Sequence, residues 1–327
     1  MSQLLSDYWL HFATDVAILA LAALGLYVCF IAGQFSLAHA ALMGGGAYAA
    51  GAIATKTELP YTVGFGVAIV VGTLLSLAMG ALLALRLREF YLAIGTLAFN
   101  LAVIVVINNN DSLGGPTGLL GISLETTANM ALVAVALVVV AVHLVERTRL
   151  GRAMRAIHDD ETMAAANGVR VWRVKLATFA ISGAITGLAG GMHAHFLGLA
   201  RPDHYGFAHS TELWVPVIVG GASLVIGPLI GAFVVGIVPE ILNRQLDDVD
   251  PLIISGALLI LAALFRPSGL VRRGDLRRLR ERFASSPADA AEDGAQPADP
   301  ERPPAPSGPM AVADPSADPI RASEGAR

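Results

Sequence analysis

Four histidines are the first residues in this 327-residue chain whose type and spacing suggest chemistry, because imidazole nitrogens commonly bind metal ions. His193 and His195 are two residues apart, and His204 and His209 follow a short way downstream. No cysteine or carboxylate framework accompanies them, and residues two apart point to different sides of a helix. We therefore interpret them as polar residues at the edge of an apolar segment and predict no metal site.

A glycine-rich stretch, GGPTG at 114–118, raises the question of phosphate binding. It lacks the lysine that follows the glycines of a P-loop, and no helix pattern begins after it. No Walker motif occurs elsewhere in the sequence. We therefore predict no catalytic residues and expect that this chain does not hydrolyse ATP itself.

Polar residues inside apolar stretches are a second kind of candidate. They are Gln34, Ser36, His39, Thr96 and Asn100. Lipid penalises unpaired polar groups, so we expect these side chains to face protein or a water-filled cavity. Two interpretations stay open: they line a solute pathway, or they form hydrogen bonds between helices worth about 0.6–2 kcal/mol each.

The composition places these residues in a membrane protein. The chain is 55% hydrophobic and only 15% charged, with a mean hydropathy of +0.63, whereas soluble domains carry about 25% charged residues. Its apolar runs cover 13–32, 33–54, 62–85, 91–107, 130–145, 176–199, 213–242 and 251–265. We predict an all-α polytopic membrane protein with about seven to nine transmembrane helices, including broken or re-entrant glycine-rich segments.

Basic residues predict the orientation. Arg86, Arg88, residues 147–175 and residues 266–282 flank the apolar runs and belong on the cytoplasmic side. The N-terminus then lies outside, and run 213–242 must return to the side from which it entered. We expect a re-entrant hairpin that turns between Gly220-Gly221 and Pro228.

Two domains are expected. Residues 1–270 form the membrane domain. Residues 271–327 form a cytoplasmic tail that is first basic and then rich in Pro, Ala and Asp, a composition that predicts disorder from about residue 281.

The segment 147–175 is the longest polar interruption of the membrane domain. Residues 150–157 read as a helix that carries Arg152 and Arg155 on one face. Asp159, Asp160 and Glu161 then mark the start of a second, short helix, which Asn167-Gly168 ends. We favour a docking element for a partner. The alternative is an ordinary cytoplasmic loop whose arginines set the topology.

Four blocks of sequence resemble a known family. They are GQFSLAHAALMGGGAYAA, FYLAIGTLAFN with the downstream SLGGPTGL, GRAMRAIHDDETMAAANGV, and VIVGGASLVIGPLIGA with the ending FRPSGL. In this order they are similar to permeases of bacterial ABC importers for branched-chain amino acids, and more to the LivM-type than to the LivH-type subunit. The resemblance covers residues 33–270. Ala38 stands where that family often has glycine, and one glycine is missing around Ala222 and Ser223.

The resemblance implies that segment 147–175 contains a coupling helix that sits in a cleft of a separate ATPase. The positions that match the family's coupling segment are Glu161, Ala164, Ala165 and Gly168. With three further charged residues of the segment, Arg152, Arg155 and Asp160, they are the residues expected to couple to the ATPase. The expected pathway residues are Gln34, Ser36, His39, Thr96, Asn100, Gly220 and Gly221.

The resemblance also implies a function and a set of partners. We expect a non-enzymatic permease subunit of an ATP-driven importer for branched-chain or related amino acids in the bacterial inner membrane. Its partners would be a paralogous permease, two ATPases that use ATP and Mg²⁺, a periplasmic amino-acid-binding protein and lipid, with no cofactor of its own and no nucleic acid. One alternative is a permease for urea, a short amide or a sugar. Another is a stand-alone secondary carrier, and the scarcity of intramembrane acids disfavours this second alternative. A third alternative, a scaffolding protein, is suggested only by the long tail.

Overall fold

The computed structural model describes residues 2–87 and 89–243, together with positions 256, 257, 260, 264, 269 and 270. Arg88, the basic residues 266–282, most of the apolar run 251–265 and the C-terminal tail therefore lie outside the described residues.

The described chain is almost entirely helical, as the composition predicts. The helices are α1 (Ser2–Phe30), α2 (His39–Lys56), α3 (Tyr61–Met79), α4 (Glu89–Asn108), α5 (Ala128–Arg147), α6 (Arg149–Asp159), α7 (Glu161–Ala166), α8 (Val171–Leu197), α9 (Phe207–Glu212), α10 (Trp214–Gly220) and α11 (Ile226–Asn243). A π-helical stretch, Gly80–Ala84, extends α3, and short 3₁₀ turns cover Asp111–Leu113, Gly115–Thr117 and Pro202–Tyr205.

Five of the described helices are long and apolar enough to cross a membrane. Their spans are Tyr8–Phe30, Tyr61–Ala84, Phe90–Asn108, Ala128–Arg147 and Val171–Leu197. At about 1.5 Å per residue, each covers roughly the 30 Å of a bilayer core. The chain is therefore a polytopic all-α membrane protein.

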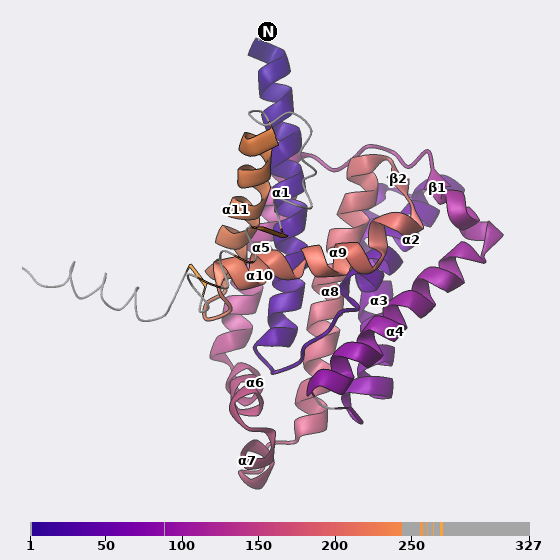
Figure 1. The fold of residues 1–327 in the computed structure, drawn as a ribbon. Helices are drawn as coiled ribbons and strands as arrows, with labels where there is room; N and C mark the ends of the chain where they lie inside the picture. The colour runs from indigo at the N-terminus through magenta and orange to yellow at the C-terminus, as the bar shows by residue number, and fades with distance from the viewer. Residues whose placement is uncertain are drawn as a thin grey trace, which may run out of the picture. The chain divides into compact units, whose positions relative to one another are not determined.

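Helix α8 lies at the centre of the bundle and packs against α1, α2 and α3 (Figure 1). Small residues permit the close approach: a Cβ at Gly46 of α2 would lie 2.3 Å from the carbonyl oxygen of Gly187 in α8. The weakly hydrophobic α2 is buried along most of its length. Its Gly44-Gly45-Gly46 triplet packs closely against neighbouring segments, and the helix is continuous there.

The expected hairpin turn in run 213–242 is present. Helix α10 ends at Gly220, Gly221 follows with φ +93°, and α11 begins at Ile226. A Cβ at Gly220 would lie 1.8 Å from the carbonyl oxygen of Gly227, so the two arms can meet only through glycine. In Figure 1, α9 and α10 lie across the middle of the bundle, and α11 returns toward the end that holds the N-terminus.

The connection before this hairpin is more ordered than the sequence indicates. Strand β1 (Leu119–Leu120) pairs antiparallel with β2 (Leu199–Ala200), which joins the loop before α5 to the segment after α8. The stretch 201–210 contains a 3₁₀ turn and most of α9. Pairs only two residues long carry no alternating pattern that would reveal them in the sequence.

Candidate functional site

The segment 147–175 folds as its capping residues predict. Asp160 Oδ1 accepts hydrogen bonds from the backbone N–H groups of Thr162 and Met163, at 2.7 and 2.9 Å. Gly168 ends the unit with φ +81°, a conformation that favours glycine. The segment is therefore two helices, α6 and α7, that project from the end of the bundle opposite the N-terminus (Figure 1).

One ion pair fastens α7 to the bundle. Lys175 Nζ lies 2.9 Å from Glu161 Oε2, and the lysine side chain is only 5% exposed. The same Nζ lies 3.5 Å from the carbonyl oxygen of Ala84, at the end of the α3 extension. A buried ammonium needs such a partner, so this pair joins the first residue of α7 to α8.

A second ion pair fastens α6. Arg155 Nη2 donates to Glu146 Oε2 at 2.7 Å, and Tyr27 Oη donates to the other oxygen of that carboxylate. Glu146 belongs to α5 and its side chain is 8% exposed. The carboxylate therefore joins α1, α5 and α6. The sequence analysis did not select Glu146, although a lone acid at the end of an apolar run beside an arginine cluster was a usable signal.

The seven expected coupling residues divide into three groups: exposed residues, residues paired within the chain, and the buried Ala164. Arg152, Asp160, Ala165 and Gly168 are exposed, so a partner can reach them. Arg155 and Glu161 are instead paired within the chain, as described above.

Ala164 is 5% exposed and packs in an apolar cluster with residues of α1, α5 and α6. Its side chain therefore supports α7 from inside, and its role in coupling stays a prediction. The sequence analysis missed two exposed apolar side chains on the same segment, Met163 at 61% and Trp172 at 52% exposure. The Arg173 guanidinium lies 5.1 Å from the ring centre of Trp172.

The polar residues expected on the pathway are all buried, and most are hydrogen-bonded within the protein. Asn100 Nδ2 donates to Ser210 Oγ at 2.7 Å and to the carbonyl oxygen of Leu37 at 3.3 Å. The N–H of Leu37 donates to Thr96 Oγ1 at 2.9 Å. These bonds connect α4 to the loop before α2 and to α9.

His39 and Ser36 make further connections between segments. His39 Nε2 lies 2.8 Å from Ser182 Oγ of α8, and Trp214 Nε1 donates to the carbonyl oxygen of Ser36 at 3.2 Å. Gly220 and Gly221 form the hairpin turn next to this region. Hydrogen bonds between segments therefore involve the side chains of His39, Thr96 and Asn100 in this conformation. The pathway role of the whole set stays a prediction.

Gln34 differs from the others because it lines a cavity. Its Nε2 donates to the carbonyl oxygen of Ala32 at 3.3 Å, and its Oε1 has no hydrogen-bond partner among the described residues. The cavity has a volume of about 460 Å³ and lies between the loop before α2 and segment 147–175, with Glu161 and Lys175 in its wall.

Three of the four histidines, His193, His204 and His209, form a local cluster. His193 Nδ1 lies 3.0 Å from Tyr205 Oη, and His209 Nδ1 lies 3.0 Å from Glu212 Oε2. Burial is the main cause that lowers the pKa of His204 below its usual value. Within the described ranges, no group of three or more His, Cys, Asp or Glu residues is arranged to hold a metal ion.

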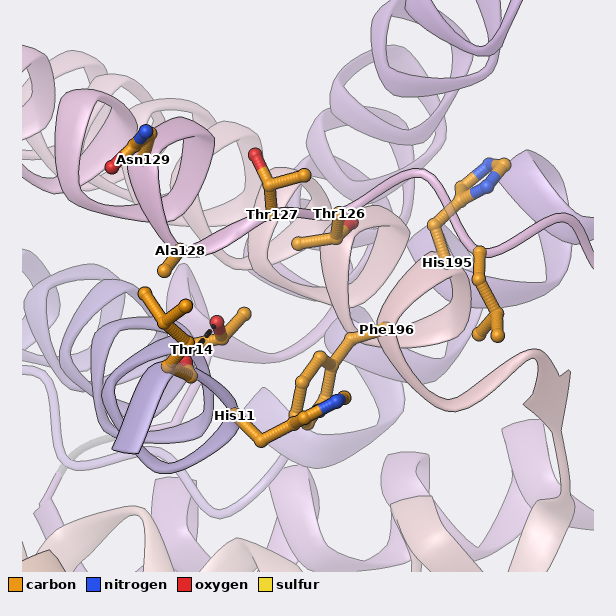
Figure 2. Close-up of a pocket in the computed structure, with 10 residues that line it drawn as sticks. His11, Thr14, Thr126, Thr127, Ala128, Asn129, His195 and Phe196 are labelled. Carbon is orange, nitrogen blue, oxygen red and sulfur yellow. Dashed lines mark hydrogen bonds between the residues drawn. The ribbon is translucent and has the colours of Figure 1, made fainter. Parts of the chain in front are cut away.

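A second cavity of about 370 Å³ opens near the N-terminal end of the bundle. Figure 2 shows that its walls come from α1 with His11 and Thr14, from the loop just before α5 with Thr126, and from α8 with Phe196. The Thr14 and Thr126 hydroxyls already donate to backbone carbonyl oxygens. These two hydroxyl donors are therefore already used within the protein.

Comparison with known proteins gives several matches. The family model for the permease component of branched-chain amino acid transport systems matches residues 8–263. The high-affinity branched-chain amino acid transport system permease protein LivM of Escherichia coli K12 is 31% identical over 266 residues, covering 69% of this chain and 62% of LivM. LivH of the same strain is 31% identical over 132 residues, covering 40% of this chain and 42% of LivH. The chain thus matches less than two thirds of the length of LivM.

A sugar permease also matches. The ribose import permease protein RbsC of Haemophilus influenzae is 28% identical over 281 residues, covering 79% of this chain and 84% of RbsC. No solved structure matches the chain.

Proposed function

Since the chain belongs to the family of permease components of branched-chain amino acid transport systems, we propose that it is the membrane-spanning permease subunit of an ATP-driven importer for branched-chain or related amino acids. The observation that supports a coupling role is the two ion pairs, each with one buried member, that join α6 and α7 to α1, α5 and α8. A loop that only set topology would need its arginines but not these internal pairs.

In the proposed mechanism, the two ion pairs transmit the displacement of α6 and α7 to the transmembrane helices. When the ATPase dimer closes, it displaces the exposed face of α6 and α7, including Met163 and Trp172. Arg155 passes the displacement to α5 and α1 through Glu146, and Glu161 passes it to α8 through Lys175. Only ATPase contacts that differ between the two states can shift the equilibrium between outward-open and inward-open forms.

The distribution of basic residues supports an orientation of the permease in the membrane. The basic segment 147–175 lies on the cytoplasmic side by the positive-inside rule. The N-terminus and the paired β1–β2 loops then face the periplasm, in the inner membrane of a bacterium, and the tail is cytoplasmic. The outer loop that carries Asp203 and Glu212 is the proposed docking surface for a periplasmic amino-acid-binding protein.

The proposed assembly contains two kinds of permease and two ATPases. The match to both LivM and LivH supports a paralogous permease as the membrane partner. The ATPases bind ATP and Mg²⁺, and this chain contributes no cofactor site and no catalytic residue.

Two substitutions test the coupling role. Glu161→Arg places a second cation beside Lys175, and Gly168→Leu forces a side chain into a left-handed backbone. Both variants should insert into the membrane but lose solute-stimulated ATPase activity in the reconstituted complex. Gly121→Leu is the matched control, because Gly121 has φ +77° and equally open surroundings in an outer loop. Wild-type coupling in both test variants would remove the docking role.

A second candidate function is a sugar permease, which the longer alignment with RbsC favours. Proteoliposomes that contain the complex separate the two, because ATP-driven uptake of labelled leucine should be reduced by unlabelled valine and not by ribose. Inhibition by ribose and not by valine would support a sugar permease. Uptake by the purified chain without any ATPase would indicate a secondary carrier.

A further inference from the structure

The cavity beside α7 has a mixed lining that fits a particular class of ligand. Its polar side carries Gln34, Asp159, Asp160, Glu161 and Lys175. Its volume of about 460 Å³ lies within the range of about 300–1,000 Å³ that small-molecule sites occupy.

Two of the three carboxylates are already in use. Asp160 caps α7, and Glu161 pairs with Lys175. Asp159 forms no hydrogen bond or ion pair within the part of the chain that the structure describes, so its carboxylate can accept from a ligand. Gln34, 3% exposed, offers an unused Oε1 acceptor in the same wall. These acceptors suit an ammonium group.

The buried Lys175 ammonium supplies the opposite charge. It has three N–H donors, of which one is directed to Glu161 and one is within 3.5 Å of the carbonyl oxygen of Ala84. One donor therefore remains for a ligand carboxylate. An ammonium acceptor and a carboxylate donor in one cavity match the two ends of a free α-amino acid.

Part of the remaining wall is aliphatic. Leu87, Leu92 and Ile157 line the cavity there, with His158 and Thr162 beside them. An aliphatic side chain that lies against Leu87, Leu92 and Ile157 leaves water for an apolar contact, which favours binding.

We propose that this cavity binds a free aliphatic α-amino acid as its zwitterion, on the side of the bundle that carries α7. The inference rests on the proposed function and names a site for its substrate class. Because Asp159 and Lys175 flank α7 in sequence, a ligand that bridges them stabilises the position of α7 seen here. Amino acid that accumulates on this side then slows the coupling movement.

The test is direct binding of L-leucine to the full chain in detergent, without ATPase or binding protein. Equilibrium dialysis with labelled leucine should show one saturable site. Leucinamide lacks the carboxylate and 4-methylpentanoate lacks the ammonium, and each should compete at least tenfold more weakly than leucine. Equal competition by either analogue overturns the zwitterion assignment.

Variants locate the site. Asp159→Asn changes an exposed side chain, and Gln34→Leu removes an unsatisfied buried acceptor, so neither should prevent folding. Each should weaken leucine binding at least tenfold, whereas Asp111→Asn in an outer loop should not. Unchanged binding in Asp159→Asn, or no saturable binding to the wild type, overturns the inference.

The outcomes separate this inference from the function on which it rests. ATP-driven leucine uptake without leucine binding to the isolated chain overturns only the proposal that the cavity binds leucine. Leucine binding without ATP-driven uptake overturns the proposed function.

Discussion

Removal of the Glu161 carboxylate should destabilise the protein far more than an ordinary surface substitution. In Glu161→Gln, the ammonium of Lys175 stays buried at 5% exposure. The amide oxygen that replaces the carboxylate carries no full negative charge. The other neighbour of the ammonium, the carbonyl oxygen of Ala84, lies at 3.5 Å, beyond the usual range of a strong hydrogen bond. Breaking a buried pair costs about 3–5 kcal/mol, and because the Glu161 side chain is 30% exposed we expect about 3 kcal/mol, the lower end of that range.

The chain contains its own control for this prediction. Arg201 and Asp203 form an ion pair at 3.0 Å, similar in length, but their side chains are 47% and 70% exposed. Solvent screens such a pair, so Asp203→Asn should cost less than about 1 kcal/mol. The contrast between the two pairs isolates burial as the cause.

Equilibrium unfolding of the full chain in detergent micelles measures both free energies. A double-mutant cycle that combines Glu161→Gln with Lys175→Met should give a coupling energy above about 1 kcal/mol, since the double variant no longer buries an unpaired charge. Additive effects of the two substitutions, or equal costs for Glu161→Gln and Asp203→Asn, would refute the claim that this pair fastens α7 to the bundle.

Three further predictions concern packing, polar connections and pH. Gly46→Val should reduce the folded fraction on size-exclusion chromatography, since a Cβ there lies 2.3 Å from a carbonyl oxygen of α8, whereas Gly66→Val has open space and should elute as the wild type does. Asn100→Leu should lower the free energy of unfolding by about 1–2 kcal/mol, because it removes two hydrogen bonds. Asn109→Leu, at an exposed position, should lower it little. Equal losses would contradict the bridging role of Asn100. Burial lowers the pKa of His204, so the unfolded chain takes up this proton first as the pH falls below about 6.5, and stability should fall on acidification. That decrease should be smaller in His204→Gln when unfolding is compared at about pH 8 and about pH 5, and an identical decrease would show that His204 does not contribute.

The membrane helices were predictable because their signal is local and strong. Length and hydrophobicity placed α4 and α5 within a few residues of their bounds in the structure. The boundaries of α6 and α7 followed from Asp160 and Gly168, whose preferences for a helix start and a left-handed turn are properties of single residues. Gly220-Gly221 marked the hairpin turn for the same reason.

The partners of the polar residues were not predictable from the sequence. Glu161 read as a capping residue open to a partner, but it pairs with Lys175, 14 positions away across the start of α8. Tyr27 and Glu146 meet across 119 positions, and no local pattern encodes such a contact. Ala164 and Ala165 are adjacent alanines, and only the packing of α7 buries the first and exposes the second.

ATP-driven uptake tests the proposed function most directly. The chain, its paralogous permease, the ATPases and the binding protein should together transport labelled leucine into proteoliposomes when ATP is present on the ATPase side. The same assembly with Glu161→Arg should transport none, and assembly with Gly121→Leu should transport at the wild-type rate. Leucine uptake that continues without ATP, or that is unchanged by Glu161→Arg, would contradict the account.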